Sequence, residues 1–191
     1  MGMDNAENPN DEGQLVSEYE YTQESRETDL IVQSMRYEQN LFGGIIGGAL
    51  GALIGAGLWA VITVITESQL GIVAIGVGYL VGFGVRKLGK SIDMYFRIIG
   101  AVMTLIGIAF GNLLVIAIWV SRIEGIPFFM LLRSLDIKTM YELLKVTFEP
   151  IDLVFYAIGV QQAYMHSSSK IDRNAIIAQL QNKAKEPTDF R

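Results

Sequence analysis

The sequence predicts an all-α, polytopic transmembrane helical bundle of three to four spans with an interfacial amphipathic helix, and three observations support it. The 191 residues are 51% hydrophobic and 18% charged, whereas soluble domains are nearer a quarter charged. Charge-free segments follow one another along the chain, and the longest exceed the ~20 residues that a helix needs to cross a bilayer. Sixteen of the 20 glycines lie between residues 41 and 120, inside these apolar segments.

The N-terminal region differs from the rest of the chain in charge. Residues 1–40 carry ten acidic and two basic side chains, a charge of −8, against +3 for the remainder. Residues 1–28 are too polar to bury enough surface to offset ordering, so they are predicted to form a disordered cytoplasmic tail. Residues 29–40 are then a juxtamembrane segment. An acidic tail on a mildly basic body argues against nucleic acid as a partner.

A transmembrane domain is predicted over residues 41–165. Its spans are expected at about 41–65, 70–87, 98–120 and 150–166. The first is the clearest, because 25 residues without a charge make a helix longer than the ~30 Å hydrocarbon core. The second ends at Arg86 and Lys87, which can snorkel to the interface. The fourth has an apolar segment of only 15 residues, 151–165, so whether it crosses fully stays open.

Residues 126–148 form the amphipathic segment. Ile137, Met140, Tyr141, Leu144 and Phe148 recur at helical spacing, with Lys138, Glu142, Lys145 and Glu149 on the opposite face. This pattern predicts an amphipathic helix, capped by Ser134 or Asp136, that lies in the membrane interface. A soluble helix packed on the bundle is the alternative. Residues 166–191 complete the chain as a cytoplasmic C-terminal tail, with a short helix expected over 169–184.

The loops predict an orientation. The first loop has no basic residue, whereas the second carries Arg86, Lys87, Lys90 and Arg97 against Asp93 alone. The positive-inside rule therefore places the second loop and the N-terminus in the cytoplasm. With four spans the C-terminus lies there too.

Glycine spacing predicts how the spans pack. The recurring pattern comprises Gly43, Gly47, Gly51 and Gly55 in the first span, Gly78 and Gly82 in the second, and Gly107 and Gly111 in the third. Glycines four residues apart line one face of a helix and let another backbone approach closely, so helix packing is the expected role. A glycine-lined pore or sliding surface is the alternative.

Catalytic and metal chemistry find little support. Cysteine is absent and His166 is the single histidine, so no catalytic, cofactor-binding or metal-ligating residues are expected, and the protein is predicted not to be an enzyme. Asn112, Asp152 and Gln161 are the candidates for a polar path through the membrane. Interhelical hydrogen bonding is an adequate alternative explanation for Asn112 and Gln161 within the spans. Asp152 is also explained by its place in the first turn of a helix, where the helix dipole favours a negative charge.

Residues 58–92 also match a recognisable pattern. The matching positions are 59–63, 69–71, 74–82, Val85, Arg86, Gly89 and Lys90, followed by 99–101, 105–112 and 152–157. Over these positions the chain resembles a widespread group of bacterial multi-spanning membrane proteins with a glycine-rich first helix and no assigned activity. Ile72 and Val73 depart from the aromatic and methionine residues expected there. The resemblance implies a bacterial inner membrane.

Together these features predict a non-enzymatic accessory or scaffolding subunit of an inner-membrane assembly. Its expected partners are the lipid bilayer and either other membrane subunits or further copies of itself. The alternative is a small channel or transporter with a glycine-zipper-lined path. The sequence does not predict a transported solute, a partner's identity or an oligomeric state.

Overall fold

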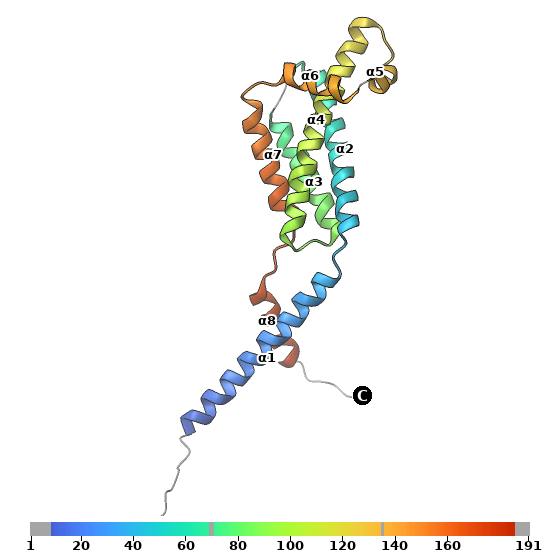
Figure 1. The fold of residues 1–191 in the computed structure, drawn as a ribbon. Coiled ribbons are helices and arrows are strands. Elements are labelled where there is room, and N and C mark those ends of the chain that lie inside the picture. The colour runs from blue at the N-terminus through green and yellow to red at the C-terminus, as the bar shows by residue number, and fades with distance from the viewer. Residues whose placement is uncertain (1–8, 69–70, 135, 186–191) are drawn as a thin grey trace, which may run out of the picture. The chain divides into compact units, whose positions relative to one another are not determined.

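The computed structural model describes residues 9–68, 71–134 and 136–185, and within these ranges the regular structure is entirely helical (Figure 1). The helices are α1 (Pro9–Tyr37), α2 (Leu41–Thr66), α3 (Ile72–Gly89), α4 (Met94–Glu124), α5 (Phe128–Ser134), α6 (Ile137–Thr147), α7 (Asp152–His166) and α8 (Arg173–Lys185). Two compact units result: one contains α1 and α8, and the other, Glu38–Ser169, contains the remaining helices. The predicted all-α class is confirmed.

Three of these helices are long and apolar enough to cross a membrane: α2, α3 and α4, with 26, 18 and 31 residues. The chain is therefore a membrane protein with three candidate spans. Helix α4 is longer than the 98–120 expected, because it continues through Arg122 and Glu124 until Gly125 adopts a left-handed conformation and ends it. The predicted start of the second span at residue 70 lies outside the described residues.

Helix α7 has 15 residues and is not among the candidate spans. It packs along α3 and α4 within the same unit, where Gly159 and Ala163 are buried. Figure 1 shows α2, α3, α4 and α7 side by side along their lengths. The fourth helix of the predicted bundle is therefore present, but it is too short to count as a fourth span by length.

The contact between α2 and α3 joins backbone to backbone. A Cβ placed on Gly47 would lie 2.1 Å from the carbonyl oxygen of Gly84, and a Cβ on Gly84 would lie 2.1 Å from that of Gly47. One turn away on each side, a Cβ on Gly43 or Gly51 would lie 2.2 or 2.7 Å from the backbone of α3. Since real Cβ atoms do not approach this closely, the helix spacing requires glycine.

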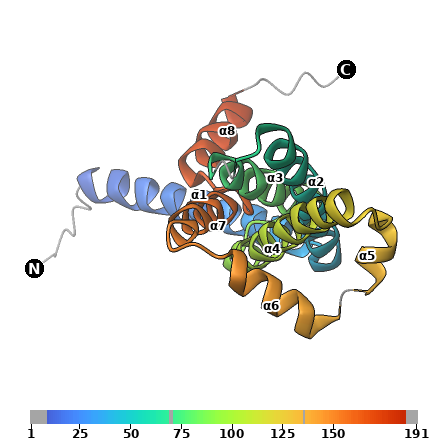
Figure 2. The ribbon, with the colours of Figure 1, turned by 90° about the horizontal axis from the view of Figure 1, so that it is seen from above.

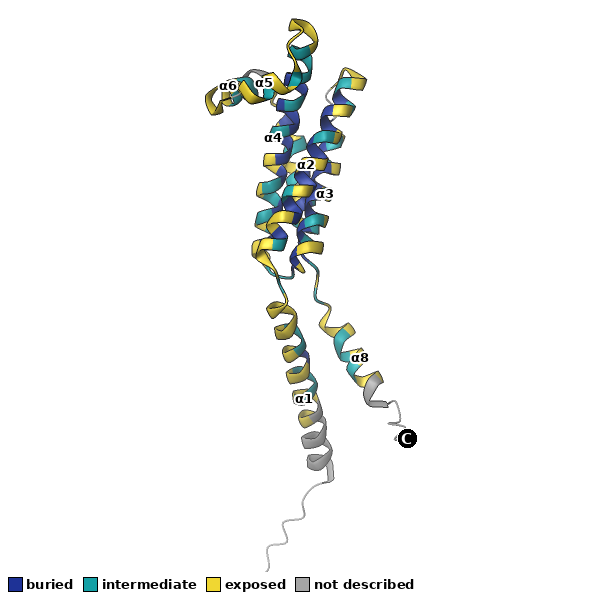
Figure 3. Ribbon diagram, turned by 90° about the vertical axis from the view of Figure 1, so that its right-hand side faces the viewer, coloured by how far each residue is buried: buried dark blue, intermediate teal, exposed yellow. Residues whose placement is uncertain are grey.

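Helix α3 meets α7 in the same way on its other side. A Cβ on Gly78 would lie 2.0 Å from the carbonyl oxygen of Gly159, and one on Gly82 would lie 2.9 Å from the Cβ of His166. Contacts between α4 and α2 at Gly107 and Gly111 are looser, since Cβ atoms there would meet Ala52 and Trp59 at 3.1 Å. Figure 3 shows the buried residues gathered where α2, α3 and α4 face one another.

The α5–α6 segment lies beside α4, as the view from above in Figure 2 shows. Asp136 caps α6, because its Oδ1 accepts a hydrogen bond of 2.7 Å from the backbone N–H of Thr139. Hydrogen bonds from the side chain and backbone of Thr139 also hold the pKa of Asp136 below its usual value. Ser134, the other predicted cap, instead donates its hydroxyl to the carbonyl of Leu131.

The N-terminal region departs from the predicted disorder, since α1 begins at Pro9 and so covers most of residues 1–28. Composition measures only how much surface a segment can bury by itself. Helix α1 packs against α8, the helix expected in the C-terminal tail, and buries Thr28 completely. A partner helix from the far end of the chain thus stabilises a segment that is too polar to form a core alone.

The backbone contact at Gly47 generates a stability prediction with a matched control on the same helix. Gly47→Ala should lower the free energy of unfolding by about 1–3 kcal/mol, because the new Cβ forces α2 and α3 apart. Gly57→Ala meets nothing within 4 Å and should leave stability unchanged or raise it by about 1 kcal/mol. Denaturant unfolding in detergent micelles, followed by circular dichroism, measures both; equal stabilities would contradict the close approach.

Candidate functional site

The α3–α4 loop is tied to the segment that enters α2. The side-chain oxygen of Gln39 accepts hydrogen bonds from the backbone N–H groups of Ile92 and Asp93, each at 3.0 Å. Its amide nitrogen donates to the carboxylate of Asp93 at 2.7 Å. The backbone N–H of Asn40 donates to the carbonyl of Gly89 at 2.9 Å, and the Asn40 side chain caps α2. Several polar contacts therefore hold the segment that enters the bundle against this loop.

The same loop is tied to the segment that leaves α7. Ser91 is fully buried, and its hydroxyl donates to the carbonyl of Ser167. The backbone N–H of Ser169 donates to the carbonyl of Ser91 at 2.7 Å. Arg97 donates its Nε–H to the hydroxyl of Ser168, also at 2.7 Å. We call Gln39, Ser91, Asp93, Arg97 and the serines 167–169 the loop latch.

The loop latch brings the entry and the exit of the bundle to one end, which also carries the basic residues of the α3–α4 connection. Lys90 pairs with Glu38 at 3.1 Å, and the guanidinium of Arg97 lies 5.7 Å from the ring centre of Tyr164. Sequence reasoning found these cations but missed the serines, because a run of Ser167, Ser168 and Ser169 reads as an ordinary polar linker. Only their position against the loop shows that they bind it.

A second polar cluster lies within the bundle and contains two of the three residues predicted for a polar path. Asn112 is only 6% exposed, and its amide nitrogen donates to the hydroxyl of Tyr156 at 2.7 Å. Asp152 is buried one helical turn before Tyr156, and its carboxylate accepts from the backbone N–H of Glu149 at 3.0 Å. Gln161 is exposed on a later turn of α7 and takes no part in this cluster.

Asn112 has an unsatisfied side. Its side-chain oxygen is buried without a hydrogen-bond partner, as is the indole N–H of Trp59. Tyr156 links Asn112 to α7, and sequence reasoning missed it, although its position four residues after Asp152 places the two on one helix face. The cluster can hold a hydrogen-bonding group. Its members form one local group and not a row of polar side chains along the bundle.

In the described part of the bundle, the buried polar side chains near this cluster include Thr63 and Thr104. The buried hydroxyl of Thr104 donates to the carbonyl of Gly100 within its own helix, at 2.8 Å. The hydrophobic core is made of Ala, Val, Ile, Phe and Trp side chains. Among the described residues no group of three or more His, Cys, Asp or Glu side chains is placed to hold a metal ion.

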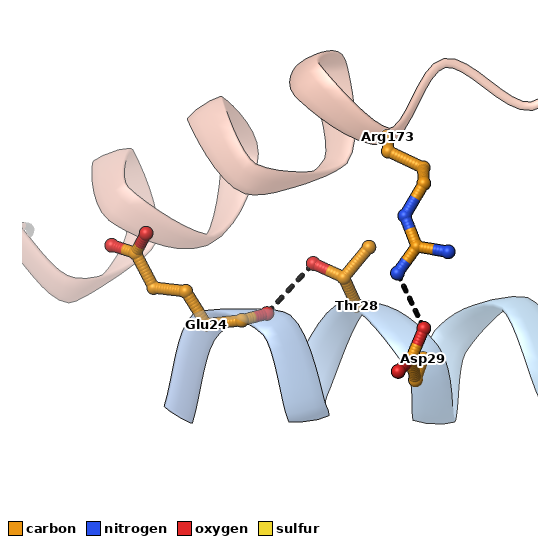
Figure 4. Close-up of polar contacts among 4 residues, drawn as sticks. All are labelled: Glu24, Thr28, Asp29 and Arg173. Carbon is orange, nitrogen blue, oxygen red and sulfur yellow. Dashed lines mark hydrogen bonds and ion pairs between the residues drawn. The ribbon is translucent and has the colours of Figure 1, made fainter. Parts of the chain in front are cut away.

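The α1–α8 unit has its own polar contacts, shown in Figure 4. Asp29 of α1 forms an ion pair with Arg173 of α8. Glu24 accepts a hydrogen bond on its carboxylate from Gln181 at 2.9 Å, and its backbone carbonyl accepts from the buried Thr28 hydroxyl at 2.8 Å. These residues share one face of α1, which is the face that meets α8.

The other face of α1 is exposed and bears aromatic side chains. Tyr19, Leu30 and Tyr37 are 65%, 58% and 81% exposed. Their spacing places all three on the helix face opposite Thr28, since a helix turns about 100° per residue. Glu18 and Glu27 are exposed on the two flanks of this face, about 100° and about 80° around the helix from Tyr19. We call Glu18, Tyr19, Glu27, Leu30 and Tyr37 the α1 outer face.

Comparisons with known proteins do not supply an identity, because no family model, curated protein or solved structure matches this chain. The resemblance to bacterial membrane proteins with a glycine-rich first helix stays a prediction. The function must therefore be argued from the α1–α8 unit, the bundle and its two polar clusters.

The Asn112–Tyr156 hydrogen bond predicts a non-additive pair of substitutions. Tyr156→Phe leaves both sides of a buried amide unpaired, so the free energy of unfolding should fall by about 1–3 kcal/mol. Adding Asn112→Leu removes the unpaired amide, and the double variant should be more stable than the sum of the single changes implies.

Tyr141→Phe is the matched control, because that ring is 63% exposed and should tolerate the change. Thermal unfolding of the unmodified protein, the two single variants, the double variant and this control in one detergent gives the coupling energy between Asn112 and Tyr156. If the changes in the free energy of unfolding simply add, the amide of Asn112 does not depend on the Tyr156 hydroxyl for a hydrogen-bond partner.

Proposed function

We propose that this protein is a non-enzymatic membrane anchor that docks a basic partner protein through the α1 outer face. The observation that supports this most directly is the pairing of α1 with α8. Helices α1 and α8 pack into one unit that contains none of the candidate spans. They are 144 residues apart in the sequence at the Asp29–Arg173 ion pair. That pairing satisfies one face of α1 and leaves the other available.

The chemistry of the α1 outer face suggests the kind of partner. Pro9–Tyr37 contains seven acidic and two basic residues, so a basic surface would be attracted to it over a Debye length of about 8–10 Å. Exposed tyrosines are enriched at protein interfaces, because they bury much apolar area and keep a polar end. A basic protein segment with apolar side chains fits both properties.

The packing of the bundle favours an anchoring role. Helices whose backbones touch, as at Gly47 and Gly84 or Gly78 and Gly159, leave no space between them for a solute. The described core around these contacts is apolar, whereas ion and proton pathways use ionisable side chains within the spans. A rigid bundle is what an anchor needs.

The membrane and orientation belong to the same proposal. Arg86, Lys87, Lys90 and Arg97 lie at the end where the chain enters and leaves the bundle. The positive-inside rule favours the cytoplasm for that end, so α1 and α8 would both be cytoplasmic. The resemblance to bacterial membrane proteins favours the inner membrane.

One observation favours a second candidate function, a carrier. The buried and unsatisfied oxygen of Asn112, beside Tyr156 and Asp152, is suited to hydrogen-bond a polar solute. Flux of ions or small polar solutes into proteoliposomes, abolished by Asn112→Leu, would support this function over the anchor.

The docking proposal predicts a salt-dependent partner. Purification of the full chain from native membranes in mild detergent should recover a basic protein in stoichiometric amount. Glu18→Gln with Glu27→Gln should weaken this association by about three- to tenfold at low salt and less at high salt, because exposed charges are screened.

The control is Glu142→Gln with Glu149→Gln, which removes two exposed carboxylates of the α6 region and should leave the recovery unchanged. Recovery of the chain alone, or of a partner insensitive to the first pair of changes, would overturn docking through α1.

A further inference from the structure

A groove runs between α2, α4 and α6. Its volume is about 450 Å³, within the range of sites that hold small apolar ligands. Ala49 and Ala52 of α2 and Gly107 and Ala109 of α4 line it, and these small side chains leave the hollow between the two spans. Each of its eleven lining residues is apolar, so it offers an occupant contact area and no hydrogen bond.

Helix α6 covers one part of the groove. Met140 and Leu144 line it, while Lys138, Glu142 and Lys145 are exposed on the opposite side of α6. Spacing of three to four residues keeps each set on its own face. Helix α6 thus turns an apolar face to the groove and a charged face away from it, as an amphipathic helix packed on the spans does.

The groove opens sideways on the surface that the spans present to lipid. Leu53 and Ile106 line it and are 57% and 55% exposed, in the middle of two helices that are candidate spans. It extends from Met140 along α4 to Met103, two turns closer to the start of that helix than Phe110. An occupant can therefore enter from the bilayer without passing through the bundle.

We propose that this groove binds one acyl chain of a bilayer phospholipid. A lipid is the expected occupant because the groove is a recess in the surface that the spans present to lipid. The lining favours the acyl chain over the headgroup of that lipid, because the lining contains no polar or charged side chain. In the groove the chain lies against Met140 and Leu144 of α6 and runs along the small residues of α4. This site is independent of docking by α1.

The probe that tests the proposal is a phospholipid with a photoreactive diazirine in one acyl chain. The full chain is reconstituted in vesicles of phosphatidylethanolamine and phosphatidylglycerol that contain this probe, illuminated and digested, and the labelled residues are located by mass spectrometry. Label should concentrate on Ala109, Met140 and Leu144. Ile98 and Val102 are lipid-facing residues of the same helix, 55% and 49% exposed, and should label at the lower level of ordinary lipid contact.

A variant that fills the groove distinguishes binding of an acyl chain in the groove from ordinary lipid contact of exposed residues. Ala109→Phe should reduce the label on Met140 and Leu144 by about tenfold, because the ring occupies the space of several methylene groups. Ile98→Phe adds the same ring outside the groove and should leave the label unchanged. Leu144→Trp fills the groove from α6, which packs on α4, and gives an independent measurement if Ala109→Phe does not fold.

Three results would overturn the proposal. Label spread evenly over Ile98, Val102 and Met140 would show ordinary annular lipid. Unchanged labelling of Met140 in both filling variants would place the chain elsewhere. An unlabelled Met140, together with an amine-reactive crosslink between the Lys138 side chains of two copies, would show that a protein surface, and not a lipid, covers the groove.

Discussion

The structure depends on the contact of helix backbones at glycine. In a bilayer, apolar side chains gain nothing by leaving lipid for another apolar surface, so helices associate mainly through close packing and hydrogen bonds. The contacts of Gly47 with Gly84 and of Gly78 with Gly159 supply that packing along both sides of α3. Helix α3 is consequently the centre of the bundle, with α2 on one side and α7 on the other.

The polar contacts follow from this packing. Because α7 is held against α3, Tyr156 reaches Asn112, and the serines after α7 reach the α3–α4 loop. The loop latch then satisfies backbone groups at the end of the bundle, where helix termini would otherwise leave donors and acceptors unpaired. A change in the α3–α7 spacing would therefore disturb the loop latch and the Asn112–Tyr156 hydrogen bond together, although no polar residue had been altered.

The sequence predicted what depends on local composition and missed what depends on distant neighbours. Three spans could be predicted because three charge-free apolar segments, of 25, 16 and 23 residues, follow one another along the chain, and a membrane-spanning helix is their common explanation. Asp136 was one of two predicted caps, and the structure selects it by its bond to Thr139. Tyr156 and the serines 167–169 could not be identified, since each acquires its role from a residue at least 44 positions away. Helix α1 was predicted to be disordered for the same reason, because its partner is α8.

The two proposals assign a different kind of recognition to each of the two units. The bundle is apolar and rigid, and its recess under α6 is suited to a hydrocarbon chain that is present at high concentration around it. The α1–α8 unit is charged, and its free face suits a partner that arrives through water and is attracted by charge. Neither surface could perform the other's task, since a charged face is costly in lipid and an apolar recess in water would collapse or aggregate. Under the docking proposal, a protein that holds an aqueous partner at a membrane uses both surfaces.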